Sequence, residues 1–281
     1  MATIDYEAEY NNRARVPEHE AIFLRWAGEA ELYRADRLKA GGAELGLSYG
    51  DTPRQSVDVF LPEAGAEAPL ALFIHGGWWR SLDPSMFSQM ARGPNARGVA
   101  VAVVGYDLCP NVTIADIVEQ MRRACAVLWQ RFGRRIFACG HSAGGHLAAC
   151  LVATDWAALY PKAPADLVPA GYAISGVFDL APLLDITPNQ DLRLDAETAR
   201  QLSPAFWPLA PGRGFEVAVG GLESSEFKRQ SRLIVDAWKN TTTVPYMEIP
   251  GTNHFTVIDG LADPQSAMAG RVAELALQLK A

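Results

Sequence analysis

A serine lies between glycines in the segment Gly140-His141-Ser142-Ala143-Gly144, directly after an apolar run. Glycines on both sides let the backbone turn tightly, so that the serine side chain projects from the end of a strand. The small residues at 145–149 favour a helix whose first N–H groups face a developing negative charge. This strand–turn–helix pattern predicts that Ser142 is a nucleophile for acyl transfer.

A second glycine pair precedes the serine, in the segment His75-Gly76-Gly77-Trp78-Trp79. Acyl transfer places negative charge on a carbonyl oxygen, so hydrogen-bond donors must already point at that atom. Two residues without side chains let the backbone approach a substrate closely. We expect the N–H groups of Gly76 and Gly77, together with that of Ala143, to form this oxyanion hole.

The chain has five histidines, and a serine nucleophile needs one of them as its base. Four are poorly placed, because they belong to the glycine motifs, lie on a rigid helix just after the serine or precede every predicted strand: His75, His141, His146 and His19. His254 instead follows the last predicted strand, from which a loop can fold across the top of a sheet. We therefore predict His254 as the general base.

An acidic residue must orient that histidine and should lie between the serine and the histidine in the chain. Glu223 follows the predicted strand 215–220, and the interval to His254 leaves room for one helix and one strand. We predict Glu223 as this acid. Asp179 and Glu226 remain alternatives, although Glu226 also fits the first turn of the next helix, where a negative charge is favourable.

Short apolar runs alternate with longer amphipathic stretches, and this alternation predicts a mostly parallel α/β sheet flanked by helices. The predicted strands are 56–61, 70–75, 99–106, 135–140, 170–175, 215–220 and 244–249, and the predicted helices are 18–38, 114–131, 142–154, 226–239 and 264–279. Strand 56–61 alternates apolar and polar residues, as an edge strand does. Two segments interrupt the rhythm, 1–40 with its helix and 180–211, and we expect them to form a small lid over the sheet.

Composition limits the classes of function. The formal net charge of −7 excludes a basic nucleic-acid footprint, and no apolar run is long enough to span a membrane. The N-terminus does not resemble a signal peptide, and the four cysteines have no metal-binding spacing. We therefore expect a cytoplasmic protein that requires neither a metal nor an organic cofactor. A homodimer is left open.

The motifs resemble those of the kynurenine formamidase (arylformamidase) branch of the α/β-hydrolases, near the HGG-type esterases. His75 to Trp79 resembles the HGGxW of that branch, Gly140 to His146 its GHSAGxH, and residues 175–180 its SGvyDL segment. Glu223 falls where the family carries a carboxylate followed by SPEF, which supports its assignment as the acid. Further likeness at 10–13, 49–50 and 230–231 extends the resemblance over nearly the whole chain. It implies one α/β-hydrolase domain over residues 1–281.

The resemblance also implies a reaction, the removal of a small acyl group from an aryl amide or ester. Arylformamidase activity, which converts N-formylkynurenine to kynurenine and formate, is the first expectation. A broad-specificity carboxylesterase is the alternative, and a non-catalytic binding module is a third. Trp78 stands where animal formamidases usually carry tyrosine, and Glu223 where many use aspartate, so the motifs leave the substrate open.

The substrate itself is expected to be a small ester or formamide. Large rings cluster in sequence near the motifs, and ligand pockets are mostly apolar and aromatic. We predict that substrate contacts come from Trp78, Trp79, Phe178 and Phe255. Arg80 either receives a substrate carboxylate or is a solvated loop charge.

Overall fold

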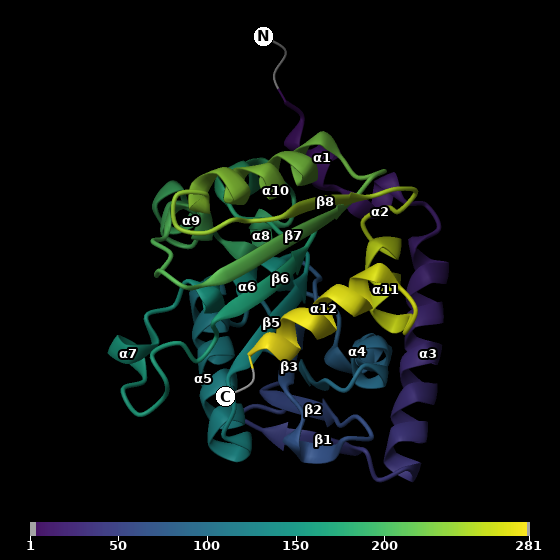
Figure 1. Cartoon of the computed structure of the whole chain (residues 1–281). Helices are drawn as coiled ribbons and strands as arrows, with labels where there is room; N and C mark the ends of the chain where they lie inside the picture. Colours follow the sequence, from purple (N-terminus) through teal and green to yellow (C-terminus); the bar gives the residue numbers. More distant parts are fainter. Residues whose placement is uncertain (1–3, 280–281) are drawn as a thin grey trace.

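One continuous sheet of eight strands organises the chain in the computed structural model, which describes residues 4–279 (Figure 1). The strand order is β1-β2-β4-β3-β5-β6-β7-β8. From β4 to β8 neighbouring strands are parallel, whereas β2 runs antiparallel to both β1 and β4. The bounds are β1 Ala43–Ser48, β2 Ser56–Phe60, β3 Leu70–Ile74, β4 Ala100–Val104, β5 Ile136–His141, β6 Ala170–Ile174, β7 Gly214–Gly220 and β8 Tyr246–Ile249.

Helices cover both faces of this sheet, and alternate residues of a strand enter different cores. In β3, Leu70, Leu72 and Ile74 face a core with α5 (Ile114–Phe132), α6 (Ala143–Val152) and α10 (Ser225–Trp238). Ala71 and Phe73 face a second core with α3 (His19–Lys39), η2 (Pro84–Ala91) and α12 (Ala267–Gln278). This layered arrangement confirms the predicted α/β-hydrolase fold.

Short elements complete the chain between these layers. The short α-helices are α1 Tyr6–Tyr10, α2 Asn12–Arg15, α4 Arg92–Ala96, α7 Trp156–Leu159, α8 Asn189–Leu192, α9 Ala196–Gln201 and α11 Asp259–Ala262. The short 3₁₀ helices are η1 Gly65–Glu67, η3 Ala181–Asp185, η4 Pro204–Phe206 and η5 Thr256–Ile258.

Strand β2 corrects one expectation, because it lies inside the sheet between β1 and β4 and not at the edge. The strand that takes the edge, Ala43–Ser48, was not predicted. The polar residue that suggested an edge is Asp58, which is buried. Its carboxylate pairs with Arg34 from α3 and accepts a hydrogen bond from Gly46 N at 2.9 Å. A buried ion pair therefore produces the same alternation as solvent exposure.

The predicted lid is only partly correct. Helix α3 runs beside the sheet, from near α2 down to β1, and packs along η2 (Figure 1). Most of α3 is therefore a flanking helix, while Phe23 and Trp26 near its N-terminal end line the cavity beside Ser142. Within the predicted segments 1–40 and 180–211, the residues that cover the carboxyl edge of the sheet come from α1, α2, the first turns of α3 and residues 186–191. The rest of 180–211 packs into the first core through residues such as Leu192, Ala199 and Ala205.

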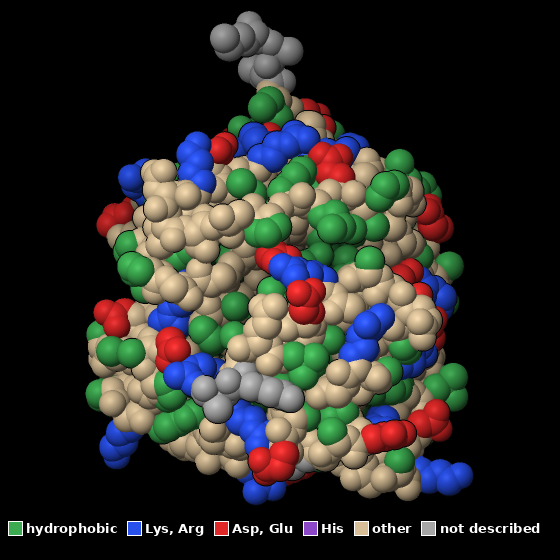
Figure 2. All heavy atoms as spheres, viewed as in Figure 1, with side chains coloured by type: hydrophobic (Ala, Val, Ile, Leu, Met, Phe, Trp, Pro, Cys, Tyr) green, Lys and Arg blue, Asp and Glu red, His purple; other side chains and the backbone are tan. Residues whose placement is uncertain are grey.

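The surface is mixed in charge on the face shown in Figure 2, where Lys and Arg side chains are interspersed with Asp and Glu. Hydrophobic side chains are scattered among them. Across the described residues, no helix is both long enough and apolar enough to cross a lipid bilayer.

Candidate active site

Ser142 lies in the tight turn between β5 and α6, with φ 56° and ψ −119°. This left-handed conformation is strained for a residue with a side chain, and it projects the hydroxyl away from the sheet. The turn fits only because Gly144 lacks a Cβ, which would come within 2.0 Å of the Ile74 carbonyl oxygen. Ser142 N also donates to the Ile174 carbonyl at 2.8 Å, which ties the turn to the next strand.

The three predicted catalytic residues, Ser142, His254 and Glu223, form a hydrogen-bonded triad. Ser142 Oγ is 3.0 Å from His254 Nε2, and His254 Nδ1 is 2.6 Å from Glu223 Oε2. The side chain of Glu223 is 0% exposed and that of His254 is 4% exposed. Glu223 therefore fixes the tautomer in which Nδ1 carries the proton and leaves Nε2 free to accept the serine proton.

The Glu223 carboxylate has two further partners. Its Oε1 accepts hydrogen bonds from Ser175 Oγ at 2.5 Å and from Gly220 N at 2.6 Å. Ser175 follows β6 and has a φ of 53°, so its hydroxyl is turned toward the acid. The sequence motif at 175–180 contained this serine, but sequence reasoning gave it no role. Together these donors hold the acid in one orientation.

His141 holds the loop that carries His254, a role that the sequence analysis did not predict. Its ring Nε2–H donates to the His254 carbonyl oxygen at 2.8 Å. Burial lowers the pKa of His141 well below its ordinary value, so the ring stays neutral. The ring of Phe227 packs against His254, with 4.4 Å between the centroids. The loop that carries the base is therefore fixed from two sides.

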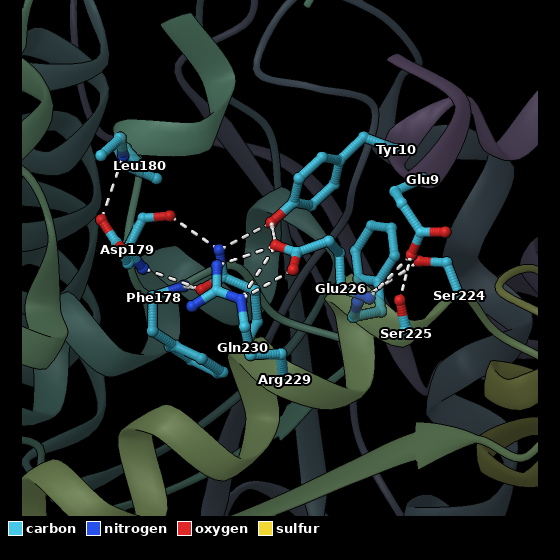
Figure 3. Close-up of polar contacts among 12 residues, drawn as sticks. Glu9, Tyr10, Phe178, Asp179, Leu180, Ser224, Ser225, Glu226, Arg229 and Gln230 are labelled. Atoms are coloured by element: carbon cyan, nitrogen blue, oxygen red, sulfur yellow. Dashed lines mark hydrogen bonds and ion pairs between the residues drawn. The ribbon is translucent and has the colours of Figure 1, made fainter. Parts of the chain in front are cut away.

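The two alternative acids take other partners. Glu226 accepts a hydrogen bond from Tyr10 Oη at 3.1 Å and forms an ion pair with Arg229 at 2.8 Å (Figure 3). Asp179 Oδ1 accepts from Ala181 N at 3.1 Å. Among the described residues, neither carboxylate bonds to His254.

The predicted oxyanion segment lies directly against the nucleophile. A Cβ on Gly76 would come within 2.9 Å of Ser142 Cβ, and Gly77 has a φ of 110° that favours glycine. Within residues 4–279, the N–H groups of Gly76, Gly77 and Ala143 donate to no protein acceptor. They remain free for a substrate oxygen.

This segment is fixed from behind by two buried rings. His75 Nδ1–H donates to the Gly76 carbonyl at 2.7 Å, and Tyr106 Oη donates to the His75 carbonyl at 2.9 Å. The two rings stack with centroids 4.4 Å apart. Burial lowers the pKa of His75 to about 4, so this ring is also neutral near pH 7.

A cavity of about 360 Å³ opens beside Ser142 and His254, within the size range of small-molecule sites. Its wall is formed by residues from the N-terminal helices, the two glycine motifs and the segment 186–191: Glu7, Tyr10, Asn11, Asn12, Arg13, Phe23, Trp26, Gly77, Trp78, Arg80, Ser81, Leu82, Phe87, His141, Ser142, Ile186, Thr187, Pro188, Asp191, His254 and Phe255. Sequence reasoning missed the N-terminal residues, although the Tyr10–Arg13 resemblance could have pointed to them.

Only two of the four residues predicted to contact the substrate lie in the cavity wall. Trp78 and Phe255 line the cavity, but Trp79 and Phe178 do not. Trp78 and Trp79 both have positive φ, so the second ring turns into the core, where it meets His146 edge-on at 5.0 Å. Phe178 is fully buried against Phe215.

Arg80 lines the cavity but is already paired. Its Nη1 lies 2.5 Å from Asp191 Oδ2, in the segment that covers the site. Arg80 is an exposed loop residue, as the second expectation had it, but the ion pair with Asp191 was not anticipated.

Other reactive groups lie away from this site. All four cysteines are buried free thiols, and burial raises the pKa of Cys109 to about 11. In the part of the chain that the structure describes, no three His, Cys, Asp or Glu side chains form a metal-binding cluster.

The fold and this site define a serine hydrolase of the α/β-hydrolase class. Residues 71–209 match the family model described as the alpha/beta hydrolase fold. The chain is 32% identical to a kynurenine formamidase of Salmo salar over 229 residues, which cover 78% of this chain and 77% of the relative. It is 30% identical to a kynurenine formamidase of Danio rerio, with 78% and 77% covered. The chain belongs to the kynurenine formamidase family.

A solved structure is similar over a still larger part of the chain. It is a protein from Silicibacter sp. TM1040 that is provisionally described as a thioesterase. The TM-score is 0.87 at 34% identity, and the match covers 96% of this chain and 99% of the other. Esterase B from Lactobacillus rhamnosis matches at a TM-score of 0.64 and 18% identity, which shows the fold alone.

Proposed function

We propose that this protein is an arylformamidase that hydrolyses N-formylkynurenine to kynurenine and formate. The observation that carries the proposal is the triad Ser142–His254–Glu223, whose serine and histidine line a partly aromatic cavity. The kynurenine formamidases of Salmo salar and Danio rerio support the choice of substrate.

The first half of the reaction acylates the serine. Ser142 Oγ attacks the formyl carbon while His254 Nε2 takes the hydroxyl proton, and the carbonyl π electrons move onto oxygen. The N–H groups of Gly76, Gly77 and Ala143 stabilise this oxyanion, and Glu223 stabilises the imidazolium. When the intermediate collapses, the C–N bond breaks and His254 gives its proton to the departing arylamine.

The second half releases formate. A water molecule attacks the formyl ester on Ser142, and His254 removes its proton as before. The bond between the acyl carbon and Ser142 Oγ breaks, and the proton returns from His254 to the serine. Because His254 and Ser142 exchange each proton, the two half-reactions return the enzyme to its starting state, with a free Ser142 hydroxyl and a neutral His254.

The cavity suits a small acyl group joined to an aryl leaving group. Trp78 and Phe255 provide ring surfaces beside the triad, and Phe23 packs edge-on against Phe255 with centroids 5.0 Å apart. Aromatic walls of this kind contribute about 0.5–1.5 kcal/mol per ring pair beyond area burial.

A carboxylesterase is the second candidate, because the protein at 34% identity is described as a thioesterase and the triad would cleave esters by the same steps. The experiment is to measure kcat/KM for N-formyl-L-kynurenine beside p-nitrophenyl acetate and butyrate, with Ser142→Ala as the blank. A formamide value near 10⁴ M⁻¹s⁻¹ or above that exceeds both ester values would support the proposal. Fast ester cleavage with negligible formamide turnover would identify a carboxylesterase instead.

A further inference from the structure

Most polar side chains around the cavity already have protein partners. Arg80 pairs with Asp191, and Ser81 Oγ donates to the Gly77 carbonyl at 2.9 Å. The Glu7 carboxylate accepts from Thr187 N at 2.6 Å and from Asn11 Nδ2 at 3.4 Å. Groups that are satisfied in this way are poor anchors for a ligand, because each would first have to give up a hydrogen bond.

Asn12 is different. It lines the cavity and is only 6% exposed, yet its side-chain amide forms no hydrogen bond to any described residue. Side-chain amides with so little exposure are normally hydrogen-bonded to the protein or to a bound molecule. An amide left open toward a cavity is explained if a ligand supplies the missing partner.

Arg13 is the neighbouring residue on α2 and lines the same cavity. Its guanidinium carbon lies 5.9 Å from the centre of the Phe23 ring, and it forms no ion pair with a carboxylate of residues 4–279. A guanidinium presents several N–H donors in a planar fork that matches a carboxylate. Among the described residues, the cavity wall therefore contains a cation without an acidic partner, Arg13, next to a side-chain amide without a partner, Asn12.

We propose that Asn12 and Arg13 form the subsite that binds a carboxylate carried by the aryl leaving group of the substrate. This inference deepens the proposed function and rests on it for the reacting end of the substrate. Arg13 supplies the charge, and the Asn12 amide donates a second hydrogen bond to the same carboxylate. Arg80 is not the receptor, because Asp191 already neutralises it.

The subsite is held in place by a partly buried hydrogen-bond network that joins the N-terminal helices to α10 (Figure 3). Glu9 accepts hydrogen bonds from Ser225 Oγ at 2.6 Å and from Glu226 N at 3.0 Å. Tyr10 Oη bonds to Glu226 and accepts from Gln230 Nε2 at 2.8 Å. Since α2 begins two residues later, its position over the cavity is fixed before a substrate arrives, which favours binding.

The test compares substrates that differ only in the carboxylate. N-formyl-L-kynurenine is assayed beside its carboxamide, which keeps the ammonium group and removes the negative charge. Arg13→Gln is the test variant and Arg13→Lys restores the charge. Arg15→Gln is the matched control, because Arg15 lies on the same short helix but does not line the cavity.

Arg13→Gln is expected to lower kcat/KM for the carboxylate substrate by about 10- to 100-fold, mainly through KM, as expected when a charge-assisted hydrogen bond is lost. The carboxamide should change less than about 2-fold, Arg13→Lys should recover part of the loss, and Arg15→Gln should behave as wild type. Asn12→Asp, which places a negative charge beside the ligand, should also penalise the carboxylate more than the carboxamide. An equal effect of Arg13→Gln on both substrates, or no effect on either, would overturn the subsite.

A second substrate pair separates this inference from the proposed function. It consists of 3-(2-acetoxyphenyl)propanoate and the corresponding amide, two aryl acetates that any esterase with this site would cleave. If formamides are not turned over but Arg13→Gln abolishes a preference for the charged acetate, the proposed function fails and the subsite stands. If formamides are cleaved and neither pair responds to Arg13→Gln, the subsite fails and the function stands. Circular dichroism and the melting temperature of each variant identify any that does not fold.

Discussion

His254 Nδ1 lies 2.6 Å from Glu223 Oε2, and the glutamate side chain is completely shielded from solvent. The other carboxylate oxygen of Glu223 accepts hydrogen bonds from Ser175 Oγ and Gly220 N. The site thus contains a glutamate in the position that orients the base, and its burial keeps water from competing for the imidazole. This relationship can be tested directly, because a glutamine would fit the same space.

Glu223→Gln should lower kcat by about 10³- to 10⁴-fold, because the amide no longer stabilises the imidazolium and can select the wrong imidazole tautomer. Glu223→Asp, which keeps the charge on a shorter side chain, should lose less. Steady-state kinetics on the best substrate provides the measurement. Asp179→Asn is the control, since Asp179 does not bond to His254 and its variant should keep wild-type kcat. A Glu223→Gln protein within 10-fold of wild type would assign the acid elsewhere.

Gly76→Ala should lower kcat about 10- to 100-fold, because the added Cβ would approach Ser142 Cβ to 2.9 Å and displace an oxyanion donor. The matched control is Gly28→Ala in α3, where a Cβ meets no atom within 4 Å. That control should leave kcat unchanged and raise the free energy of unfolding by about 0.5–1 kcal/mol, since glycine is unfavourable inside a helix. Urea denaturation and initial rates on both variants check the pair.

Tyr10→Phe should lower the free energy of unfolding by about 1–3 kcal/mol, because it removes one hydrogen bond to the Glu226 carboxylate and one from Gln230, although Glu226 keeps Arg229 as a partner. KM should also rise, since the network positions the helix that carries Asn12 and Arg13.

Tyr6→Phe is the control, as the Tyr6 hydroxyl bonds to no described residue and only its ring contacts Tyr10. Equal effects of the two substitutions in denaturant titrations would argue against a role for the hydroxyl.

The stability of the protein should fall as the pH is lowered from about 6.5 toward about 4. Burial lowers the pKa of His75 and of His146 to about 4, from an ordinary value of 6.5. Within this window the unfolded chain binds protons that the folded chain does not, so the free energy of unfolding rises with pH. Each buried ring should contribute on the order of 1–2 kcal/mol between pH 5 and pH 7.

His146→Gln tests this linkage, because glutamine can still donate to the Leu202 carbonyl that His146 Nε2–H contacts at 2.7 Å. Urea denaturation at pH 5 and pH 7 should show a smaller pH dependence in the variant than in wild type. The same pH dependence in both proteins would mean that His146 does not contribute to acid sensitivity.

The sequence alone determined the α/β fold, seven of the eight strands and the chemical parts of the site. Ser142 and the glycine pair at 76–77 could be predicted because strained turns and close backbone approaches require particular residue types next to one another. His254 was predicted because it follows the last strand. Chain order then pointed to Glu223. These features are local, so short patterns encode them.

The tertiary structure decided which side chains face the cavity and which strand is internal. From the sequence Asp58 is expected to face solvent, but in the structure it is buried and paired with Arg34. Trp79 is expected in the pocket wall, but the turn at 78–79 places its ring in the core. Tyr10 meets Glu226 across 216 residues of chain, next to the helix whose Asn12 and Arg13 line the same cavity as Ser142. Burial depends on what distant segments pack together, and no local pattern contains that information.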